Sequence, residues 1–314
     1  MALSAPIGQP FIAVDDSAVY SKVTVWRRFR RHRMAMAGAV VLLIMVLVAV
    51  FAWKLAPFDP NAIDNVHWQG NPVAPCFENA AQCGGHLLGL DENGRDELSR
   101  LMFGAQISLT VAVSAVLMEL IIGTLLGALA GYYGGYVDYF LMRITDVFLS
   151  IPLLPLLLVL TGIVAASSTK AALSFYVIVI IIGGLSWPGV ARLVRASFLS
   201  LREREYAEAA RAVGNGDLRI MLRHLLPNAM APIIVQATLD VANVIIVESV
   251  LSFLGFGIQP PTASWGNMLS NAEATLQDQW WAAVFPGLCI LFTVLAINYI
   301  GDGLRDALDP NAIK

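Results

Sequence analysis

Charged residues are scarce in this sequence of 314 residues: they make up 14% of it, whereas hydrophobic residues make up 57%. Soluble globular domains contain about a quarter charged residues, so the composition excludes an ordinary soluble domain and indicates an integral membrane protein. Lysine is especially rare, and no lysine follows a glycine. The phosphate-binding loop GxxxxGK[ST] is therefore absent from the sequence.

Cysteine is also scarce, and no histidine–cysteine pattern with zinc spacing surrounds any of the three cysteines. We therefore predict no metal site. Cys76 and Cys83 lie in one hydrophilic stretch, where an oxidising exterior favours a disulfide over free thiols. Cys289 lies in an apolar segment and is expected to pack there. The HExxH and GxSxG motifs are absent, which argues against a membrane-embedded enzyme.

Six apolar segments are long enough to cross a bilayer core of about 30 Å at about 1.5 Å per residue. The sequence therefore predicts an all-α integral membrane protein with six transmembrane helices. Pro152, Pro155 and Pro188 interrupt the third and fourth segments. The predicted spans are Met34–Trp53, Ile107–Ala130, Tyr139–Ala165, Leu173–Val190, Ala229–Phe256 and Ala282–Gly301.

The basic residues predict the orientation, because cytoplasmic loops of membrane proteins are enriched in lysine and arginine. One side has 16 of the 20 basic residues. The other side has Lys54, Arg95, Arg100 and Lys170. Both termini and the central loop are thus expected in the cytoplasm, and the arginines act as topology signals rather than as a nucleic-acid surface. The expected parts are a disordered tail (1–25), an arginine-rich flank with the first span (26–53), an external acidic loop (54–106), a five-helix core (107–303) and a cytoplasmic tail (304–314).

The central loop, residues 202–227, carries the densest charge in the chain. Its first half is rich in good helix formers, and four residues with helical spacing predict one apolar face: Tyr206, Ala209, Ala210 and Val213. Gly214-Asn215-Gly216 should end this helix, with a left-handed conformation at one of the two glycines.

A second short helix is predicted to follow, capped by Asp217. Its expected apolar face consists of Leu218, Met221, Leu222 and Leu225. Pro227 suits the first turn of the next helix, where its missing N–H costs nothing. Two short helices joined by a turn would form a small docking knob on the membrane surface.

Glu208-Ala209-Ala210, then Gly214, then Leu226-Pro227 resemble the EAA loop of ABC-importer permeases, through which the membrane subunit grips its ATPase. His224 stands where that loop usually has isoleucine. The resemblance implies that this loop couples the permease to ATP hydrolysis. The implied coupling residues are Glu205, Glu208, Ala209, Ala210, Gly214, Asp217, Met221, Leu222 and Pro227.

Further stretches extend the resemblance from about residue 25 to the end of the chain. Residues 89–100, GLDENGRDELSR, are similar to the TDxxGRDxxSR signature that precedes the second span in peptide permeases, with Leu90 in place of threonine. A capped interfacial helix explains these residues as well as a substrate contact does. Residues 187–195, 248–266 and 301–310 also resemble the C-type permease subunit of dipeptide, oligopeptide or nickel importers.

This resemblance implies a type I ABC-importer permease fold in a bacterial inner membrane, and one half of a pathway for peptides, with nickel chelates or haem as alternative cargo. It implies no enzymatic activity and no cofactor on this chain, because ATP and magnesium would be bound by two ATPase subunits or one fused ATPase. A B-type permease subunit, an external binding protein and membrane lipid are the other implied partners.

The predicted spans themselves carry two further patterns. Gly123, Gly127 and Gly131 form overlapping GxxxG steps in the second span, a spacing that lets another helix approach closely. Three acidic residues in the spans either line a passage or form structural hydrogen bonds: Glu119, Asp240 and Glu248. An ion-coupled carrier or channel that uses these residues as a relay is the other class of function, although no repeats favour it.

Overall fold

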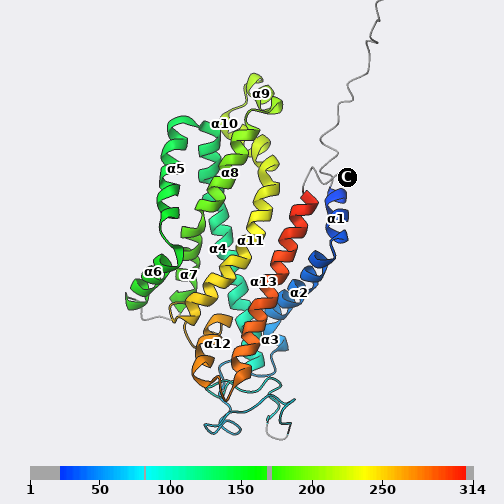
Figure 1. Cartoon of the computed structure of the whole chain (residues 1–314), viewed down its shortest axis with the longest axis vertical. Helices are drawn as coiled ribbons and strands as arrows, with labels where there is room; N and C mark the ends of the chain where they lie inside the picture. Colours follow the sequence, from blue (N-terminus) through cyan, green and yellow to red (C-terminus); the bar gives the residue numbers. More distant parts are fainter. Residues whose placement is uncertain (1–21, 81–82, 168–171, 309–314) are drawn as a thin grey trace, which may run out of the picture.

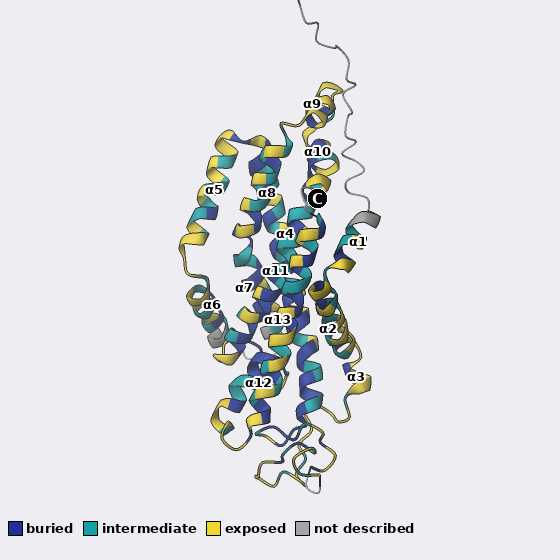
Figure 2. Ribbon diagram, turned by 45° about the vertical axis from the view of Figure 1, so that its right-hand side comes forward, coloured by how far each residue is buried: buried dark blue, intermediate teal, exposed yellow. Residues whose placement is uncertain are grey.

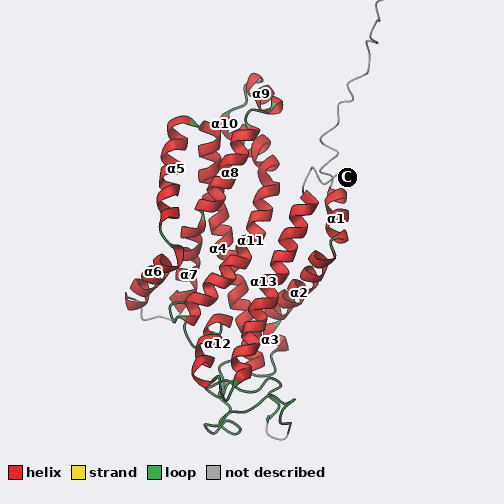
Figure 3. Cartoon of the chain, viewed as in Figure 1, coloured by secondary structure: helices red, strands yellow, loops and turns green. Residues whose placement is uncertain are grey.

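The computed structural model describes residues 22–80, 83–167 and 172–308 of the chain. Most of the predicted disordered tail and the last residues of the predicted cytoplasmic tail lie outside these ranges, as does Lys170. Most of the described residues are helical, and their only β-type pairing consists of two isolated bridges, Ile63 with Arg95 and Leu90 with Asp96 (Figure 3).

The first four helices lead from the start of the described chain into the longest helix. They are α1 (Lys22–Arg31), α2 (Arg33–Val50), α3 (Ala52–Leu55) and α4 (Glu97–Tyr133). The later elements are α5 (Gly135–Ser150), α6 (Leu153–Ser167), α7 (Ala172–Ser186), α8 (Pro188–Leu201), α9 (Glu205–Ala212), α10 (Asp217–Ile220), the π-helix η2 (Met221–Leu225), α11 (Leu226–Phe253), α12 (Trp265–Ala272), the short 3-10 helix η3 (Glu273–Thr275) and α13 (Trp280–Leu308). The loop of residues 56–96 between α3 and α4 is called the outer loop, because it lies at the end of the bundle opposite α9 and α10 (Figure 1).

The prediction of six membrane-crossing segments is confirmed, but two of the six are bent. Four helices are long and apolar enough to cross a membrane, and two helix pairs pass the same test together. The pair α5 and α6 bends by 83°, and the pair α7 and α8 bends by 41°. The bends occur at Pro152 and Pro188, because proline has no N–H to donate and disfavours helix at the residue before it.

Helix α4 forms the centre of the bundle and contacts α2, α5, α7, α8 and α11 (Figure 1). Its alanines 105, 112 and 115 are among the least exposed residues of the largest hydrophobic core. The three predicted small residues Gly123, Gly127 and Gly131 are buried and face α8. An added Cβ at Gly123 or Gly131 would come within 2.6 Å of the Cβ atom of Val190 or Phe198. The predicted close packing of this face is therefore confirmed.

The two ends of the bundle differ in what they present. Helices α9 and α10, α1 and the end of α13 lie at one end, whereas α3, α12 and the loop before α4 lie at the other (Figure 1). Phe29 and Ala35 pack against Ala307, which fixes the N-terminal helices beside the end of α13. The central loop and both ends of the described chain thus share one end, as the arginine distribution requires.

The outer surface of the bundle is apolar along its length. Leu43, Ile44 and Leu47 on α2 are exposed, as are Leu117, Ile121 and Leu125 along one side of α4 (Figure 2). Exposed hydrophobic faces of this extent are unusual on a soluble protein. They are the surface that a lipid bilayer covers.

The packing of α4 on α8 gives a first prediction. Gly127→Leu should lower the stability of the protein in detergent by about 1–3 kcal/mol, because the new side chain meets the backbone of Ala191 and the side chain of Val194. Gly189→Leu is the matched control: Gly189 is exposed on α8 and has no atom within 4 Å of an added Cβ. Denaturant unfolding of both variants measures the difference. Equal midpoints would contradict the packing role.

Candidate functional site

The central loop forms a knob that projects beyond the end of the bundle. Helix α8 ends at Leu201, α9 follows after a turn, and the chain then reverses into α10 (Figure 1). Arg202 joins the base of the knob to the end of α4, since its guanidinium donates to the carbonyl oxygens of Gly131 and Tyr132, both at 3.2 Å. Those carbonyls lie in the last turn of α4, where helix carbonyls have no partner within the helix.

The buried face of α9 differs from the predicted one. Ala207 and Ala210 are buried and belong to a small core with Ile220, Met221 and Leu225. The other three residues of the predicted face, Tyr206, Ala209 and Val213, are exposed, and the exposed fraction of Val213 is 83%. The prediction was wrong because α9 has only eight residues and sits on the bundle by its two small side chains. Glu205 and Glu208 are exposed on the same helix.

The turn after α9 has the predicted left-handed glycine. Gly214 has φ +82°, whereas Gly216 is extended with φ −69°. The N–H of Asn215 donates to Ala210 O at 3.2 Å, and the N–H of Gly214 donates to Arg211 O at 2.9 Å. These two bonds form a Schellman motif, which ends a helix through a left-handed residue.

Asp217 does not cap the second helix, contrary to the prediction. The residue at the N-cap position is Gly216, and no side chain caps α10. Instead, the Asp217 carboxylate accepts a hydrogen bond of 2.7 Å from the hydroxyl of Tyr132, and the guanidinium of Arg211 lies 5.8 Å from the centre of the Tyr132 ring. Asp217 therefore fastens the start of α10 to the end of α4.

The second helix is not separate from the fifth span. Residues Asp217–Phe253 form one continuous helix, and Pro227 lies in the first turn of its α11 portion. Met221 and Leu225 are buried as predicted, but Leu218 and Leu222 are 65% and 56% exposed. The predicted face assumed 3.6 residues per turn, whereas the turn here is a π-helix with wider i→i+5 hydrogen bonds. Leu222 lies in that turn, whereas Leu218 precedes it in α10.

Three exposed apolar side chains lie on the knob: Val213, Leu218 and Leu222. The acidic residues Glu205 and Glu208 are exposed on α9 of the same knob. Exposed apolar side chains and carboxylates on one projection have the form of a protein-docking surface.

The acidic residues of the spans are buried among polar partners. Glu248 is fully buried; it accepts from Ser252 at 2.7 Å and from Ser108 of α4 at 3.2 Å. Glu119 of α4 and Asp240 of α11 are also buried, and Gln236 donates to Asp240 at 2.9 Å within α11. Glu248 thus joins α4 to α11 through its bond with Ser108. Structural hydrogen bonding accounts for Glu248, while a role of any of the three in lining a passage stays a prediction.

Comparison with known families identifies this architecture. A family described as the inner membrane component of binding-protein-dependent transport systems matches residues 123–314. A second, described as the N-terminal transmembrane domain of oligopeptide transport permease C, matches residues 23–72. The chain belongs to this family of ABC-transporter permeases. The resemblance seen in the sequence is confirmed, and the permease is a multi-pass inner membrane subunit of a transport system.

Several curated relatives cover nearly the whole permease. It is 40% identical to the di/tripeptide transport system permease protein DppC of Pseudomonas aeruginosa (strain UCBPP-PA14), over 95% of each chain. It is 44% identical to the dipeptide transport system permease protein DppC of Escherichia coli (strain K12), over 91% of each chain. It is 42% identical to the glutathione transport system permease protein GsiD of Shigella boydii serotype 4 (strain Sb227), over 91% of this chain and 89% of the relative.

A solved structure shares the fold of the permease. An inward-facing structure of the MetNI methionine ABC transporter contains a chain that superposes with a TM-score of 0.53. The match covers 68% of the permease and 97% of that chain, at 20% sequence identity. The predicted type I ABC-importer fold is therefore confirmed.

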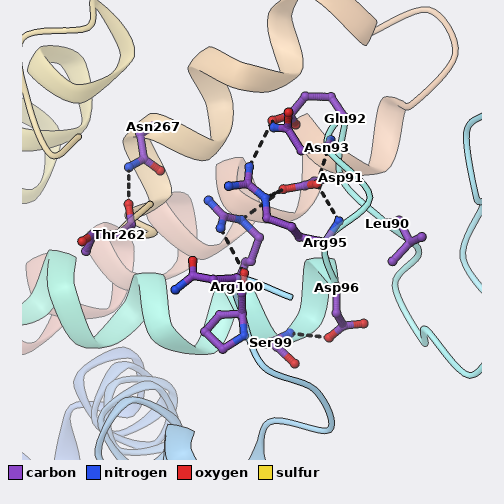
Figure 4. Close-up of polar contacts among 12 residues, drawn as sticks. Leu90, Asp91, Glu92, Asn93, Arg95, Asp96, Ser99, Arg100, Thr262 and Asn267 are labelled. Atoms are coloured by element: carbon purple, nitrogen blue, oxygen red, sulfur yellow. Dashed lines mark hydrogen bonds and ion pairs between the residues drawn. The ribbon is translucent and has the colours of Figure 1, made fainter. Parts of the chain in front are cut away.

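The GRD-containing segment of the permease forms a buried polar cluster at the outer end of α4 (Figure 4). Asp91 pairs with Arg95 at 2.7 Å and with Arg100 at 3.2 Å, and all three residues are buried. Asp96 caps α4 by accepting from the N–H of Ser99 at 2.8 Å. Asp91 thus holds the loop against the start of the helix, which favours the structural interpretation of this signature over a substrate contact.

The same segment accommodates the unusual Leu90. Its side chain is fully buried, and its carbonyl accepts from the indole N–H of Trp281 at 3.0 Å. Burial of Glu92 beside Asp91 raises the pKa of the Glu92 carboxyl above its usual range. The segment is therefore packed against α13 through both apolar and polar contacts.

Cys76 and Cys83 are joined by a disulfide in the outer loop, with their Cα atoms 5.0 Å apart. Glu78, between them, accepts a hydrogen bond of 3.1 Å from the indole N–H of Trp280 at the start of α13. The disulfide thus closes a small loop that rests on the last membrane helix. Cys289 is free and half-buried.

The disulfide gives a second prediction. In non-reduced, denatured permease, mass spectrometry should find Cys289 alkylated and Cys76 and Cys83 unmodified, and reduction should expose both. Cys289 is thus an internal control for the labelling reaction. The bond should contribute about 2–3 kcal/mol, because closing a short loop restricts the unfolded chain. Alkylation of Cys76 and Cys83 without reduction would refute the disulfide between them.

Proposed function

We propose that the permease forms one half of the translocation pathway of an ATP-driven importer of peptides, which an external binding protein delivers. Three relatives named for dipeptide, di/tripeptide or glutathione transport are 40–44% identical to the permease over about nine-tenths of its length. This breadth of similarity is the observation that carries the peptide assignment. Nickel chelates and haem are the alternative cargoes, which the experiment below separates from peptides.

The knob is the proposed contact with the ATPase. Val213, Leu218 and Leu222 present apolar surface, with Glu205, Glu208 and Ala209 exposed beside them. Ala210 and Met221 do not reach this surface but support it, since both are buried in the base of the knob. The sequence has no GxxxxGK[ST] loop, and we therefore assign ATP and magnesium binding, and ATP hydrolysis, to a separate ATPase chain.

Motion of the ATPase would enter the membrane through two rigid connections. The first is the helix from Asp217 through Pro227 to Phe253, which joins the knob to the fifth span without a break and carries Pro232 in its interior. The second is the bond between Asp217 and Tyr132, which links the knob to α4. A force on the knob is therefore transmitted to α11 and α4 together, the two helices that carry Glu119, Asp240 and Glu248.

The proposed complex contains a second, B-type permease subunit and either two ATPase subunits or one fused ATPase. The chain supplies a single knob, whereas a pair of closing ATPase domains requires two. Helices α5 and α6 are available for this assembly, because most of their exposed side chains are apolar and the two helices meet at an 83° bend. The exposed residues include Tyr139, Phe140, Leu154, Val159 and Ile163.

The third prediction tests function and coupling. In cells that lack this permease gene, wild-type permease should restore uptake of a labelled dipeptide, and Gly214→Val should not. The left-handed conformation of Gly214 would cost valine about 1–2 kcal/mol, and the relaxed turn would displace the knob. Gly216→Val is the matched control, because Gly216 is extended and also has no atom within 4 Å of an added Cβ.

Leu222→Asp tests the docking surface in the same cells. It should insert normally, because Leu222 is exposed, but it should lose uptake and co-purification of the ATPase. Leu276→Asp, a similarly exposed leucine in the turn between η3 and α13, is its control. Wild-type uptake by Gly214→Val and Leu222→Asp at normal membrane levels would refute the coupling role. If the deletion strain lost nickel or haem uptake but kept peptide uptake, the assignment of peptides as the cargo would be refuted.

The fourth prediction concerns orientation. We infer that both termini and the knob face the cytoplasm. A topology reporter fused after Asn215 should therefore behave as cytoplasmic, and one fused after Gly70 as external. Both positions are in loops, with Gly70 in the outer loop and Asn215 in the knob. The reverse pattern at either position would contradict the orientation.

A further inference from the structure

The outer loop brings together three side chains that the translocation function does not use: Asp64, His67 and His86. Nδ1 of His67 lies 2.7 Å from Oδ2 of Asp64, and Nε2 of His86 lies 3.0 Å from the same oxygen. The three donor atoms all lie within 4.8 Å of one another. Asp64 and His67 are one turn apart, whereas His86 comes from the far side of the loop.

His86 is placed as a metal-ligating histidine is placed. Its side chain is 3% exposed, and its Nδ1 lies 2.8 Å from Oδ1 of Asp96. Metal-bound histidines typically donate their second ring N–H to a carboxylate, which fixes the tautomer and the ring orientation. With that proton on Nδ1, the lone pair of Nε2 points toward Oδ2 of Asp64. The ring of Phe58, 4.3 Å away, shields one face of the imidazole.

Hydrogen bonds alone do not satisfy this cluster without placing a charge on the buried ring of His86. His86 faces a carboxylate at each nitrogen, so two hydrogen bonds require a doubly protonated, charged ring at a buried position. Oδ2 of Asp64 faces Nδ1 of His67 as well as Nε2 of His86. A divalent cation between these atoms would take the place of the ring protons and would suit neutral histidines and an ionised aspartate together.

The Asp64 carboxylate is held ready for such a cation. Its Oδ1 accepts from the backbone N–H groups of Val66 and His67 at 2.9 and 3.1 Å, which leaves Oδ2 directed at the two rings. The backbone N–H of Asp64 donates to Gly94 O at 2.9 Å, so the turn itself is anchored.

We propose that Asp64, His67 and His86 form a binding site for a divalent transition-metal ion, with zinc as the best fit. Imidazole nitrogen and carboxylate oxygen are ordinary zinc ligands at about 2.0–2.2 Å. Tetrahedral ligands at that distance lie about 3.3 Å apart, and small movements of the rings would provide this spacing. The exposed side chain of His67 can move and leaves a route from the external solvent. The fourth position is open to water or to an external donor.

This site is distinct from the proposed docking and translocation residues. It would tie the chain around residue 64 to the chain around residue 86, beside Asp96, the capping residue of α4. Gly84 supports the arrangement, because a Cβ there would come within 2.7 Å of the His67 ring. The metal would therefore brace the outer loop at the start of the central helix.

The test measures zinc bound to the purified full-length permease in its complex. After treatment with a chelator, the protein is incubated with zinc, passed through a desalting column and analysed for metal. We expect wild type to bind one more zinc ion per permease than Asp64→Asn or His67→Ala binds. Cobalt in place of zinc should give the visible absorption of a tetrahedral site in wild type only. Asp96→Asn, which changes the partner of His86 but keeps an oxygen that can cap α4, should weaken binding about 10–100-fold.

Asp59→Asn is the matched control, because Asp59 is a loop aspartate whose Oδ1 accepts from the backbone N–H of Asn61 at 2.8 Å and which contacts neither ring. It should bind zinc as wild type does. Because His67 is exposed, His67→Ala should fold, and the thermal stability of each variant without metal provides the check. If wild type binds no more zinc than His67→Ala, the cluster is a protonated hydrogen-bond network and the proposal fails. Equal zinc in wild type and Asp64→Asn would overturn it as well.

Discussion

The close contact between α4 and α8 is the constraint on which the rest of the permease depends. Gly123, Gly127 and Gly131 let the backbones approach so nearly that an added Cβ at any of the three would collide with α8. Lipid gives helices little hydrophobic reason to associate, so contact area and shape must hold them together. The end of α4 that this contact positions is also where Arg202 and Asp217 attach the knob. A shift of α8 along α4 would therefore displace the docking surface.

Buried polar side chains also contribute to the contacts between helices. Glu248 accepts a hydrogen bond from Ser108 across the contact between α4 and α11, and Glu119 and Asp240 are buried on the same two helices. Such groups are costly in lipid, and they are retained here between two helices that shield them from it. Large apolar side chains lie both between the helices, where Ile182, Ile245 and Leu251 are buried, and on the outer surface. The molecule thus joins its helices through small, polar and apolar residues, and it also presents large apolar residues to the membrane.

The sequence allowed the helical class, the spans and the family to be predicted, because long apolar runs and the EAA-like spacing depend on local residues alone. The left-handed Gly214 was also within reach, since glycine follows a helix there. The roles of Asp217 and Leu222 were not. Asp217 bonds to Tyr132, a residue far away in the sequence, and Leu222 lies in a π-turn that no 3.6-residue pattern describes. His67 and His86 likewise meet only because the outer loop folds back on itself.

The length of the helix that begins at Asp217 has a mechanical consequence. Its 37 residues extend about 55 Å, so almost half of the rod extends beyond a hydrocarbon core of about 30 Å. A rod of that length is a lever, and a tilt of about 10° about its outer end would carry the tip through about 10 Å, given a rise of about 1.5 Å per residue. Displacements on the scale of a domain closure at the tip thus become small rotations inside the bilayer. Such rotations leave the backbone hydrogen bonds of the helix intact.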